Sequence, residues 1–330
     1  MKVLVVKLSS LGDVIHTLPA LSDAAAARPG IRFDWVVEEA FAEIPAWHGA
    51  VDRVIPLALR RWRERPLRYF TGPEWRRARA ALGAQSYDAV IDAQGLIKSA
   101  FIARLVAAPR YGMDRSSARE RFAALAYDHP LAVPRDMHAV QRSRLLFARA
   151  LGYALPATPA DYGIGAAITA ATNLPPDLLF LHGSARAEKL WPEEHWVELA
   201  ALAIAAGYRV WLPWGDAAEE QRARRIAAAC DGAEVLPRLD LKALAALLRG
   251  ARGAVAVDTG LGHLCAALGV PAVSLYGPTS THLVGTCGRN QVQLQSPLAG
   301  GAGTDPAALM RAITPAAAWQ ALQAAMAGAG

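Results

Sequence analysis

The chain has 330 residues, 53% of them hydrophobic, and carries a formal net charge of +6 at pH 7. This length exceeds the size at which a single hydrophobic core usually keeps growing, so we expect two domains of ordinary size. Charges interrupt the apolar residues throughout, and no run approaches the ~20 residues needed to span a bilayer, which favours a soluble protein over an integral membrane protein.

The N-terminus and the cysteines indicate a cytoplasmic protein. The apolar stretch between Lys2 and Lys7 is too short for the core of a signal peptide. The three cysteines, Cys230, Cys265 and Cys287, are widely spaced and include no C-x-x-C pair. Such a set is typical of free thiols in a reducing compartment.

The first half of the chain alternates short β-branched segments with stretches long enough for a helix. The predicted strands are KVLVVKL, FDWVVEE, DRVIPLA and YDAVIDA, and a predicted helix around 138–151 ends the half. This alternation is typical of a parallel sheet with crossover helices. Segments rich in Pro, Gly and small residues at 152–163 and 172–177 indicate a linker, so we place the domains at 1–160 and 161–330.

The same alternation restarts in the second half. Its predicted strands are DLLFLHG, RVWLPWG, AEVLP, GAVAVDTG and PAVSLYG. We therefore expect an α/β fold of two Rossmann-like, doubly wound parallel sheets facing a central cleft, with ligands at the carboxyl ends of the strands. The alanine-rich segment 315–327 predicts a last helix, which we expect to pack back on the N-terminal lobe.

The first loop that could carry chemistry is SSLGD, residues 9–13, between a predicted strand and a predicted helix. It holds one glycine and so lacks the G-x-G-x-x-G pattern of dinucleotide-binding loops. Asp13 stands near the helix start, where it could cap the helix or act as a catalytic carboxylate. From these residues alone, capping is the commoner role.

Four further features of the second half suit a phosphorylated ligand. Lys189 follows small residues that leave backbone N–H groups accessible, and the helix starting near Gly260 directs its positive end at the preceding loop. His263 could donate to a phosphate, and Glu219 could accept from ribose hydroxyls. The alternatives are a surface lysine, a plain polar histidine and a first-turn helix acid. With neither metal-ligand spacing nor a D-x-D pair, we expect no metal and no cofactor.

The positive charge belongs to the first half of the chain. Residues 1–160 carry 23 Lys or Arg against 15 Asp or Glu, whereas residues 161–330 carry 12 against 14. The excess is densest between Arg60 and Arg79. Such a region could be a solvated face, or it could bind nucleic acid, an anionic membrane or an acidic substrate. Because no nucleic-acid-binding module is recognisable, we expect no nucleic acid partner.

Several separate blocks occur in one order along the chain: KLSSLGDVIHTLPAL (7–21), FDWVVEE (33–39), IPAWH (44–48), RRWR (60–63), YDAVIDAQGLIKSA (87–100), YGMD (111–114), WPEEHW (191–196), LPWG (212–215) and VDTGLGHL (257–264). Together they resemble the lipopolysaccharide heptosyltransferase I family, inverting GT-B glycosyltransferases of family 9. The resemblance covers nearly the whole chain.

This resemblance implies an enzyme that moves L-glycero-D-manno-heptose from ADP-heptose to the Kdo of Kdo-lipid A, at the cytoplasmic face of the inner membrane of a Gram-negative bacterium. It implies that Asp13 is the general base. The implied donor-binding residues are Ser184, Ala185, Lys189, Glu219, Asp258, Thr259, Gly260, Leu261 and His263. Ala185 replaces a threonine of the family, so one hydroxyl contact is missing there.

The acceptor implied by the resemblance is rich in carboxylates and phosphates, which suits the basic first half of the chain. The implied acceptor-binding residues are Arg60, Arg61, Arg63, Lys98 and Arg119. Three alternatives remain open: a related heptosyltransferase with a later core acceptor, a sugar-nucleotide epimerase on the same scaffold, and a non-catalytic module that binds nucleotides or anionic lipids.

Overall fold

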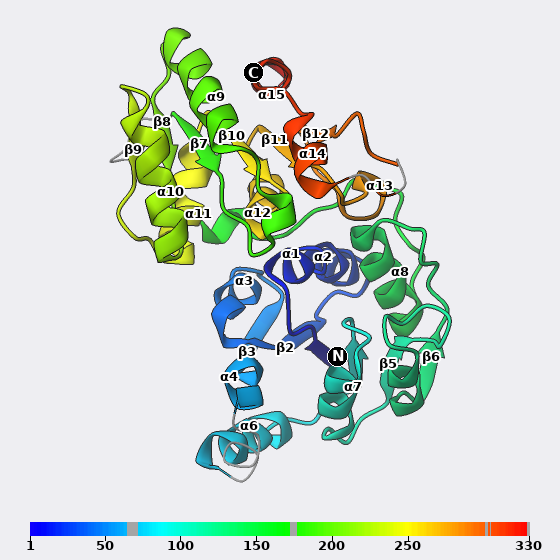
Figure 1. Ribbon diagram of the computed structural model, residues 1–330. Helices are drawn as coiled ribbons and strands as arrows, with labels where there is room; N and C mark the ends of the chain where they lie inside the picture. The colour runs from blue at the N-terminus through cyan, green and yellow to red at the C-terminus, as the bar shows by residue number, and fades with distance from the viewer. Residues whose placement is uncertain (65–71, 172–176, 301–302, 304, 329–330) are drawn as a thin grey trace. The chain divides into compact units, whose positions relative to one another are not determined.

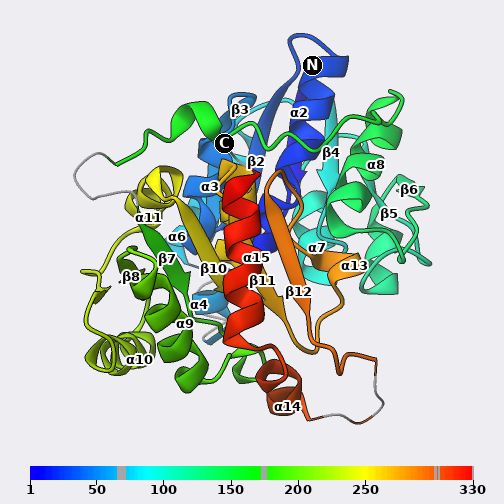
Figure 2. The same cartoon turned by 90° about the horizontal axis from the view of Figure 1, so that it is seen from above.

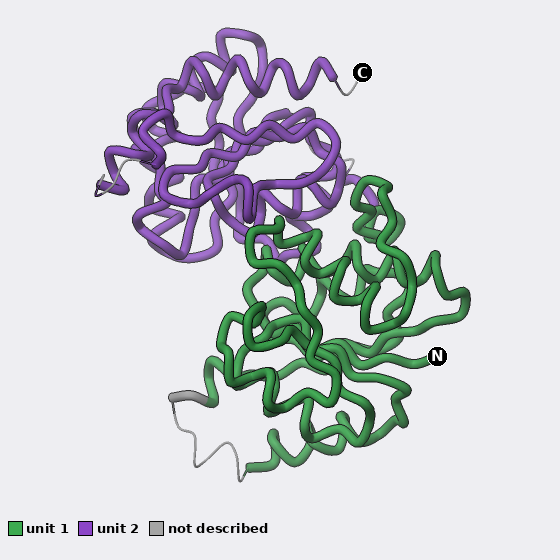
Figure 3. Tube along the Cα trace, turned by 90° about the vertical axis from the view of Figure 1, so that its right-hand side faces the viewer, with its two compact units in different colours: residues 1–167 green, residues 168–330 purple. Residues whose placement is uncertain are grey.

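The computed structural model describes residues 1–64, 72–171, 177–300, 303 and 305–328, and it divides into two compact units (Figures 1 and 3). The units are Met1–Ala167 and Ile168–Gly330. The division therefore falls a few residues beyond position 160, where the sequence placed it. No helix of the described residues is long and apolar enough to cross a membrane.

The first unit is built on a six-stranded sheet in the order β3-β2-β1-β4-β5-β6, and all its strand pairs are parallel. Its central strand β1, KVLVV, is buried from its second residue onward, as expected of a strand that is covered on both faces. The strands are β1 (Lys2–Val6), β2 (Arg32–Glu38), β3 (Val51–Leu57), β4 (Ala89–Asp92), β5 (Arg110–Met113) and β6 (His129–Leu131).

The second unit repeats this arrangement with the order β12-β11-β10-β7-β8-β9, again with every pair parallel. In both sheets the chain starts at a central strand, builds outward to one edge and then crosses back to build the other, which is doubly wound topology. The strands are β7 (Leu178–Leu181), β8 (Val210–Leu212), β9 (Ala233–Val235), β10 (Gly253–Val257), β11 (Ala272–Tyr276) and β12 (Gln291–Gln295).

Three strands were not predicted, and all lie at or beside a sheet edge. β6 is an edge strand of three residues with a proline, β5 beside it contains Gly112, and β12 alternates apolar residues with glutamines. A strand at or beside a sheet edge is less buried than a central strand and so needs fewer apolar residues. These segments therefore lack the continuous β-branched pattern of the central strands.

Helices connect the strands of each sheet. Those of the first unit are α1 (Leu11–Ile15), α2 (Leu18–Ala27), α3 (Glu43–Ala46), α4 (Leu59–Glu64), α6 (Pro73–Gly83), α7 (Ile97–Arg104) and α8 (Ala139–Leu151), with 3₁₀ turns η1 (Glu39–Phe41), η2 (Arg121–Ala126) and η3 (Gly165–Ala167). Those of the second are η4 (Ala187–Lys189), α9 (Glu193–Ala205), α10 (Ala217–Ala228), α11 (Leu241–Gly250), α12 (Gly260–Leu268), α13 (Thr281–Val284), α14 (Pro306–Arg311) and α15 (Pro315–Ala327).

The last helix packs within its own unit. Figure 2 shows α15 running over β10, β11 and β12, and the helix also contacts α9. Trp319 and Leu322 of α15 belong to the hydrophobic core of the second sheet. The apolar face of this helix is therefore buried on the second sheet, and the expected packing of the helix against the N-terminal lobe stays a prediction.

Candidate functional site

The loop after β1 is held in place by the loop after β4. Gln94 accepts hydrogen bonds through its side-chain oxygen from the backbone N–H groups of Leu8 (3.0 Å) and Ser9 (3.2 Å). The ammonium of Lys7 donates to the carbonyl of Ala93 at 3.0 Å. These contacts fix the backbone that leads into α1, the short helix on which Asp13 lies.

Asp13 caps its helix with only one of its carboxylate oxygens, which is compatible with both roles that the sequence left open. One carboxylate oxygen, Oδ2, accepts from both the backbone N–H and the hydroxyl of Ser10, each at 2.9 Å, and so caps the helix start. The other oxygen, Oδ1, lies 3.8 Å from the Lys7 ammonium, and the Asp13 side chain is 39% exposed. Capping therefore leaves one oxygen of a partly exposed carboxylate available for chemistry.

Asp13 is held ionised. Burial works to raise its pKa, but the charge of Lys7 and the two Ser10 donors outweigh burial and bring the pKa below its usual value. Arg119 adds to the lowering, so the charge of this predicted acceptor residue acts on the predicted base. The carboxylate is consequently ionised at neutral pH.

A buried carboxylate supports the loop that carries Gln94. Asp92, the last residue of β4, is fully buried and accepts from the backbone N–H groups of Gln94 (2.8 Å) and Gly95 (3.2 Å) and from the hydroxyl of Tyr127 (2.7 Å). Gly95 has a φ of +68°, in the left-handed region that favours glycine. A continuous chain of hydrogen bonds thus runs from Tyr127 through Asp92 and Gln94 to the loop before Asp13.

We expect Tyr127→Phe to destabilise the protein by about 1–3 kcal/mol, because it leaves a buried carboxylate oxygen without its donor. Burial and the Asp92 charge raise the pKa of Tyr127, so the hydroxyl remains a donor over the whole working range of pH. Urea unfolding should show a lower midpoint with an unchanged slope. Tyr111→Phe, which keeps a ring stacked on His129 at 4.7 Å, is the control and should change stability little. Equal midpoints for the two variants would contradict the role of Asp92.

The predicted acceptor residues are distributed around the same edge of the first sheet. Glu38 is the last residue of β2 and is buried. Burial raises the pKa of Glu38. The backbone N–H of Arg60 and the charges on Arg60 and Lys98 act in the opposite direction, so both cations influence this carboxyl group. Arg60 and Lys98 are themselves exposed and so are available to a ligand.

Arg61 is engaged with the protein itself, since its guanidinium pairs with Glu74 at 3.1 Å and with Glu39 at 3.4 Å. Arg119 is exposed and follows Ala118, which packs against Gly95. The backbone of Arg63 lies in α4, but its side chain is outside the described residues.

In the second unit, two predicted donor residues form an ion pair. The Lys189 ammonium lies 2.5 Å from Oδ2 of Asp258, and their side chains are 15% and 8% exposed. Lys189 ends η4, after β7, and Asp258 directly follows β10, the neighbouring strand in the sheet. Parallel neighbours bring their carboxyl ends together, which is why residues 69 positions apart meet here.

Glu219 lies over the loop after β7. Its Oε2 accepts from the backbone N–H of Gly215 at 2.7 Å. A Cβ atom on Gly183 would come within 2.1 Å of Oε1 of Glu219, so only glycine leaves room for this carboxylate. Asp216 is the residue that caps α10, by accepting from Ala218 and Glu219 at 2.9 Å each. Glu219 is thus placed at the shared carboxyl end of β7 and β8.

The start of α12 completes this edge of the second sheet. Thr259 is its N-cap, and the first helical residues, Gly260 and Leu261, are half-buried. The N–H groups of a first helical turn have no intrahelical acceptor, and they carry the positive end of the helix dipole. His263 is buried one turn further on. The loop after β7 adds Ser184, whose hydroxyl accepts from Arg186 N–H at 3.3 Å, and the exposed Ala185.

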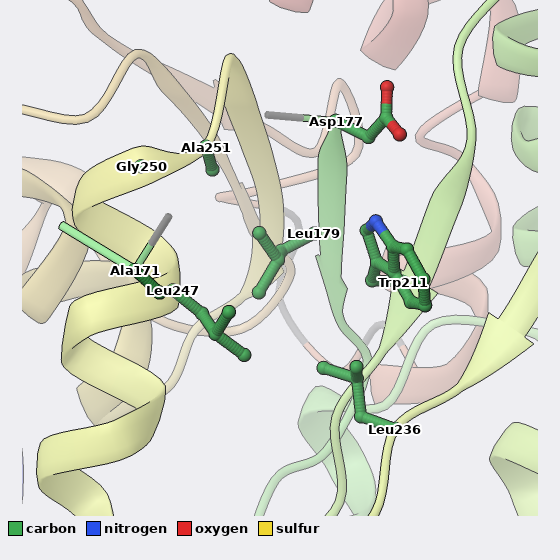
Figure 4. A pocket seen from close by; sticks show the side chains of 8 residues that line it. All are labelled: Ala171, Asp177, Leu179, Trp211, Leu236, Leu247, Gly250 and Ala251. Carbon is green, nitrogen blue, oxygen red and sulfur yellow. The ribbon is translucent and has the colours of Figure 1, made fainter. Parts of the chain in front are cut away.

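A separate cavity in the second unit is too small for a substrate. It lies among residues that include Asp177, Trp211 and Ala251, and Asp177 and Ala251 precede β7 and β10 rather than follow them (Figure 4). Its volume is about 10 Å³, which is the room of a single water. The donor candidates therefore remain those at the carboxyl edge of the sheet.

Sequence reasoning missed the residues that position the site. Lys7, Gln94 and Glu38 each lie at the carboxyl end of a strand in the first sheet, and that position was the available signal. His182, directly after β7, is also buried; burial, with the nearby charge of Arg222, lowers its pKa to about 4, so the imidazole is neutral at pH 7.

The comparisons with known proteins agree with this architecture. The model of glycosyltransferase family 9 (heptosyltransferase) matches residues 75–303. The lipopolysaccharide heptosyltransferase 1 of Pseudomonas aeruginosa is 56% identical over 90% of this chain and 84% of its own length. The Escherichia coli heptosyltransferase WaaC with ADP is 46% identical, with a TM-score of 0.91 over 98% of this chain and all of that one. The same enzyme with ADP-2-deoxy-2-fluoro heptose gives a TM-score of 0.87 over 98% of this chain and 99% of that one.

Two doubly wound sheets with polar groups at their carboxyl edges are the features of a GT-B glycosyltransferase, and the predicted fold class is confirmed. The chain belongs to glycosyltransferase family 9, the heptosyltransferases. It is an enzyme that transfers heptose in the synthesis of the lipopolysaccharide inner core, as the sequence predicted.

Proposed function

We propose that this heptosyltransferase moves L-glycero-D-manno-heptose from ADP-heptose to a Kdo residue of Kdo-lipid A, with inversion at the anomeric carbon. The similarity to a heptosyltransferase 1 over 90% of the chain supports the first-heptose acceptor. The ADP and ADP-sugar analogue named with the similar enzyme support the donor. The observation that carries the mechanism is the ionised, partly exposed carboxylate of Asp13.

In this proposal each unit has one substrate. The first unit, with Asp13, receives the acceptor, and the second unit holds ADP-heptose. Lys189 and Asp258 contact the heptose and the diphosphate, and Glu219 contacts the adenosine ribose. The phosphates are met by the remaining donor residues, namely Ser184, the backbone at Ala185, Thr259, Gly260, Leu261 and His263.

The chemical step is a single displacement. Oδ1 of Asp13 takes the proton from a Kdo hydroxyl while the hydroxyl oxygen forms a bond to the anomeric carbon of heptose. The bond from that carbon to the β-phosphate oxygen breaks, and ADP leaves with the electron pair. The N–H groups at the start of α12 and the Lys189 ammonium are suited to stabilise the charge that develops on the diphosphate, each such donor being worth up to a few kcal/mol.

The acceptor explains the excess of arginine in the first unit. Kdo carboxylates and lipid A phosphates are anions that guanidinium groups bind in a bidentate manner. We assign the binding of these anions to the guanidinium groups of Arg60, Arg61, Arg63 and Arg119 and to the ammonium of Lys98. Because the acceptor is a lipid, the enzyme would work at the cytoplasmic face of the inner membrane, in peripheral contact with it.

The test is acceptor-dependent release of ADP. The purified protein is incubated with ADP-heptose, with and without Kdo-lipid A, while ADP and the mass of the acceptor are followed. We expect ADP to appear only with the acceptor, together with the gain of one heptose. Transfer only to an acceptor that already carries heptose would indicate a later step, a changed sugar nucleotide without transfer would indicate an epimerase, and binding without turnover would indicate a non-catalytic module.

A further inference from the structure

Exposed apolar side chains are concentrated on two neighbouring elements of the first unit, α7 and η2. The described residues include eight exposed large hydrophobic side chains, and half of them lie here: Ile97 (54% exposed), Phe101 (49%), Phe122 (52%) and Leu125 (63%). The two elements pack on each other through a small core of their own, so they present these side chains as parts of one body.

The spacing along both elements aligns the exposed side chains. Ile97 and Phe101 are four residues apart on an α-helix, and Phe122 and Leu125 are three apart on a 3₁₀ helix. Residues at these separations lie on the same side of their helix. Each element therefore directs an apolar pair outward while its alanines face inward to the shared core.

An apolar pocket continues this surface. Its volume is about 630 Å³, and its wall includes Leu59, Trp75, Ile97 and Phe101. The rings of Trp75 and Phe101 stack at 6.2 Å between centroids. The surface is thus more than four isolated side chains, since it leads into a hollow with an apolar lining.

Exposed cations occur on the same two elements as the apolar side chains and beside them along the chain. Exposed cations on and beside the two elements are Lys98, Arg104, Arg115, Arg119 and Arg121. The Arg121 guanidinium lies 4.7 Å from the centroid of the Phe122 ring. The acidic neighbour Glu120 accepts from the backbone N–H of Ile97 at 2.7 Å, and Asp114 accepts from Ser116 and Ser117. Both carboxylates are therefore committed to local backbone structure.

We propose that this α7–η2 surface, made of Ile97, Phe101, Phe122 and Leu125 with the cations Lys98, Arg104 and Arg121, docks on an anionic lipid bilayer. Aromatic and aliphatic side chains would enter the interface while the cations meet phosphate headgroups. The inference rests on the proposed function for the lipid-linked acceptor, and it gives the membrane contact a definite surface. A protein partner has no comparable need for several exposed cations on the same two elements as exposed aromatic residues.

The position of the α7–η2 surface relative to Asp13 favours a lipid bilayer as its binding partner. Ile97 comes three residues after Gln94, whose side chain holds the loop before Asp13. Arg119, two residues before η2, contributes its charge to the pKa of Asp13. An acceptor anchored in the bilayer would consequently present its sugar close to the base of the same unit.

The test is sedimentation with vesicles of phosphatidylethanolamine and phosphatidylglycerol, compared with vesicles of phosphatidylcholine alone. We expect the wild-type protein to bind the anionic vesicles preferentially. Phe101→Ser with Phe122→Ser and Leu125→Ser should lower the partition coefficient at least about tenfold, since each removes apolar area from the interface. The double variant Phe122→Ser and Leu125→Ser, which keeps the Trp75 stack, should show an intermediate loss. Leu298→Ser, at a leucine of the second unit that is 47% exposed, is the control and should bind as wild type.

Transfer to a water-soluble, deacylated Kdo acceptor separates docking from catalysis. The variants should keep wild-type activity on it, which also shows that they fold. Vesicle binding needs no turnover, so it is measured independently of whether the proposed reaction is correct. Three results would each overturn the proposal. The first is equal vesicle binding by the wild type and the triple variant, and the second is no vesicle binding by the wild type. The third is self-association in solution that depends on the same side chains.

Discussion

The variant Asp13→Asn is expected to bind ADP-heptose as wild type does and to lose at least about 10²-fold in the rate of heptose transfer, the range ascribed to a general base. The amide oxygen of Asn can still accept from the Ser10 backbone N–H, so helix capping is largely kept while the proton acceptor is lost. The measurements are single-turnover transfer to Kdo-lipid A and calorimetric binding of the donor.

The control separates capping from catalysis. Ser10→Ala removes the hydroxyl that donates to Asp13 but keeps the Asp13 carboxylate. It should therefore lower the free energy of unfolding by about 0.5–2 kcal/mol and leave most of the activity. If Asp13→Asn or Asp13→Ala kept more than a tenth of the wild-type rate, Asp13 would not be the base, and its role would be reduced to that of a helix cap.

The pH dependence of kcat/KM is an independent test of the Asp13 carboxylate. Because the pKa of Asp13 lies below its usual value, the ionised form is present at neutral pH and persists on acidification to below about pH 4. kcat/KM should therefore stay constant from pH 7 toward that limit and fall only below it. Lys7→Met removes the cation that opposes burial, so the pKa should rise and the acidic fall of kcat/KM should move to higher pH. An unchanged profile would show that another group limits the rate.

The central part and one edge of each sheet could be predicted from the sequence, whereas the opposite edge, formed by β5 and β6 in the first sheet and by β12 in the second, could not. KVLVV and GAVAV form strands covered on both faces, where burial requires continuous apolar residues. QVQLQ meets a neighbour on one side only, and its half-polar pattern is equally compatible with a loop. The last helix illustrates a different limit: 315–327 reads clearly as a helix, but the sequence does not specify which surface receives Trp319.

For the candidate site, the sequence likewise predicted some residues but not the contacts between them. Asp13 and Asp258 were singled out because they follow strands and belong to recognisable blocks, and Lys189 because it lies on a loop of small residues after a strand. The structure adds that Lys189 pairs with Asp258, which no local pattern indicates because the pair depends on the neighbouring positions of β7 and β10. The support from Tyr127 through Asp92 to Gln94 also joins separate segments, and only the fold reveals it.

Lys189→Met is expected to weaken ADP binding by about 10- to 100-fold, the effect of losing a charge-assisted contact to a phosphate. This ammonium is compensated by Asp258 at 2.5 Å, in a setting where both side chains are largely buried. Its removal leaves the Asp258 carboxylate without its cation. That carboxylate then repels the diphosphate, so the variant loses an attraction and gains a repulsion.

Binding of ADP by calorimetry and the thermal unfolding midpoint together check this reasoning. Loss of a buried partner should also lower the unfolding midpoint, so affinity is measured at a temperature where the variant is folded. Lys189→Arg keeps the charge but replaces a compact ammonium by a planar guanidinium. Compared with Lys189→Met, we expect this variant to recover more of the stability than of the affinity for ADP. Lys242→Met, on the exposed side of α11, is the control for loss of one positive charge. If Lys189→Met bound ADP as tightly as Lys242→Met, the ion pair with Asp258 would be a structural feature of the second unit, and the diphosphate would have to be held by the start of α12 and the loop after β7 without Lys189.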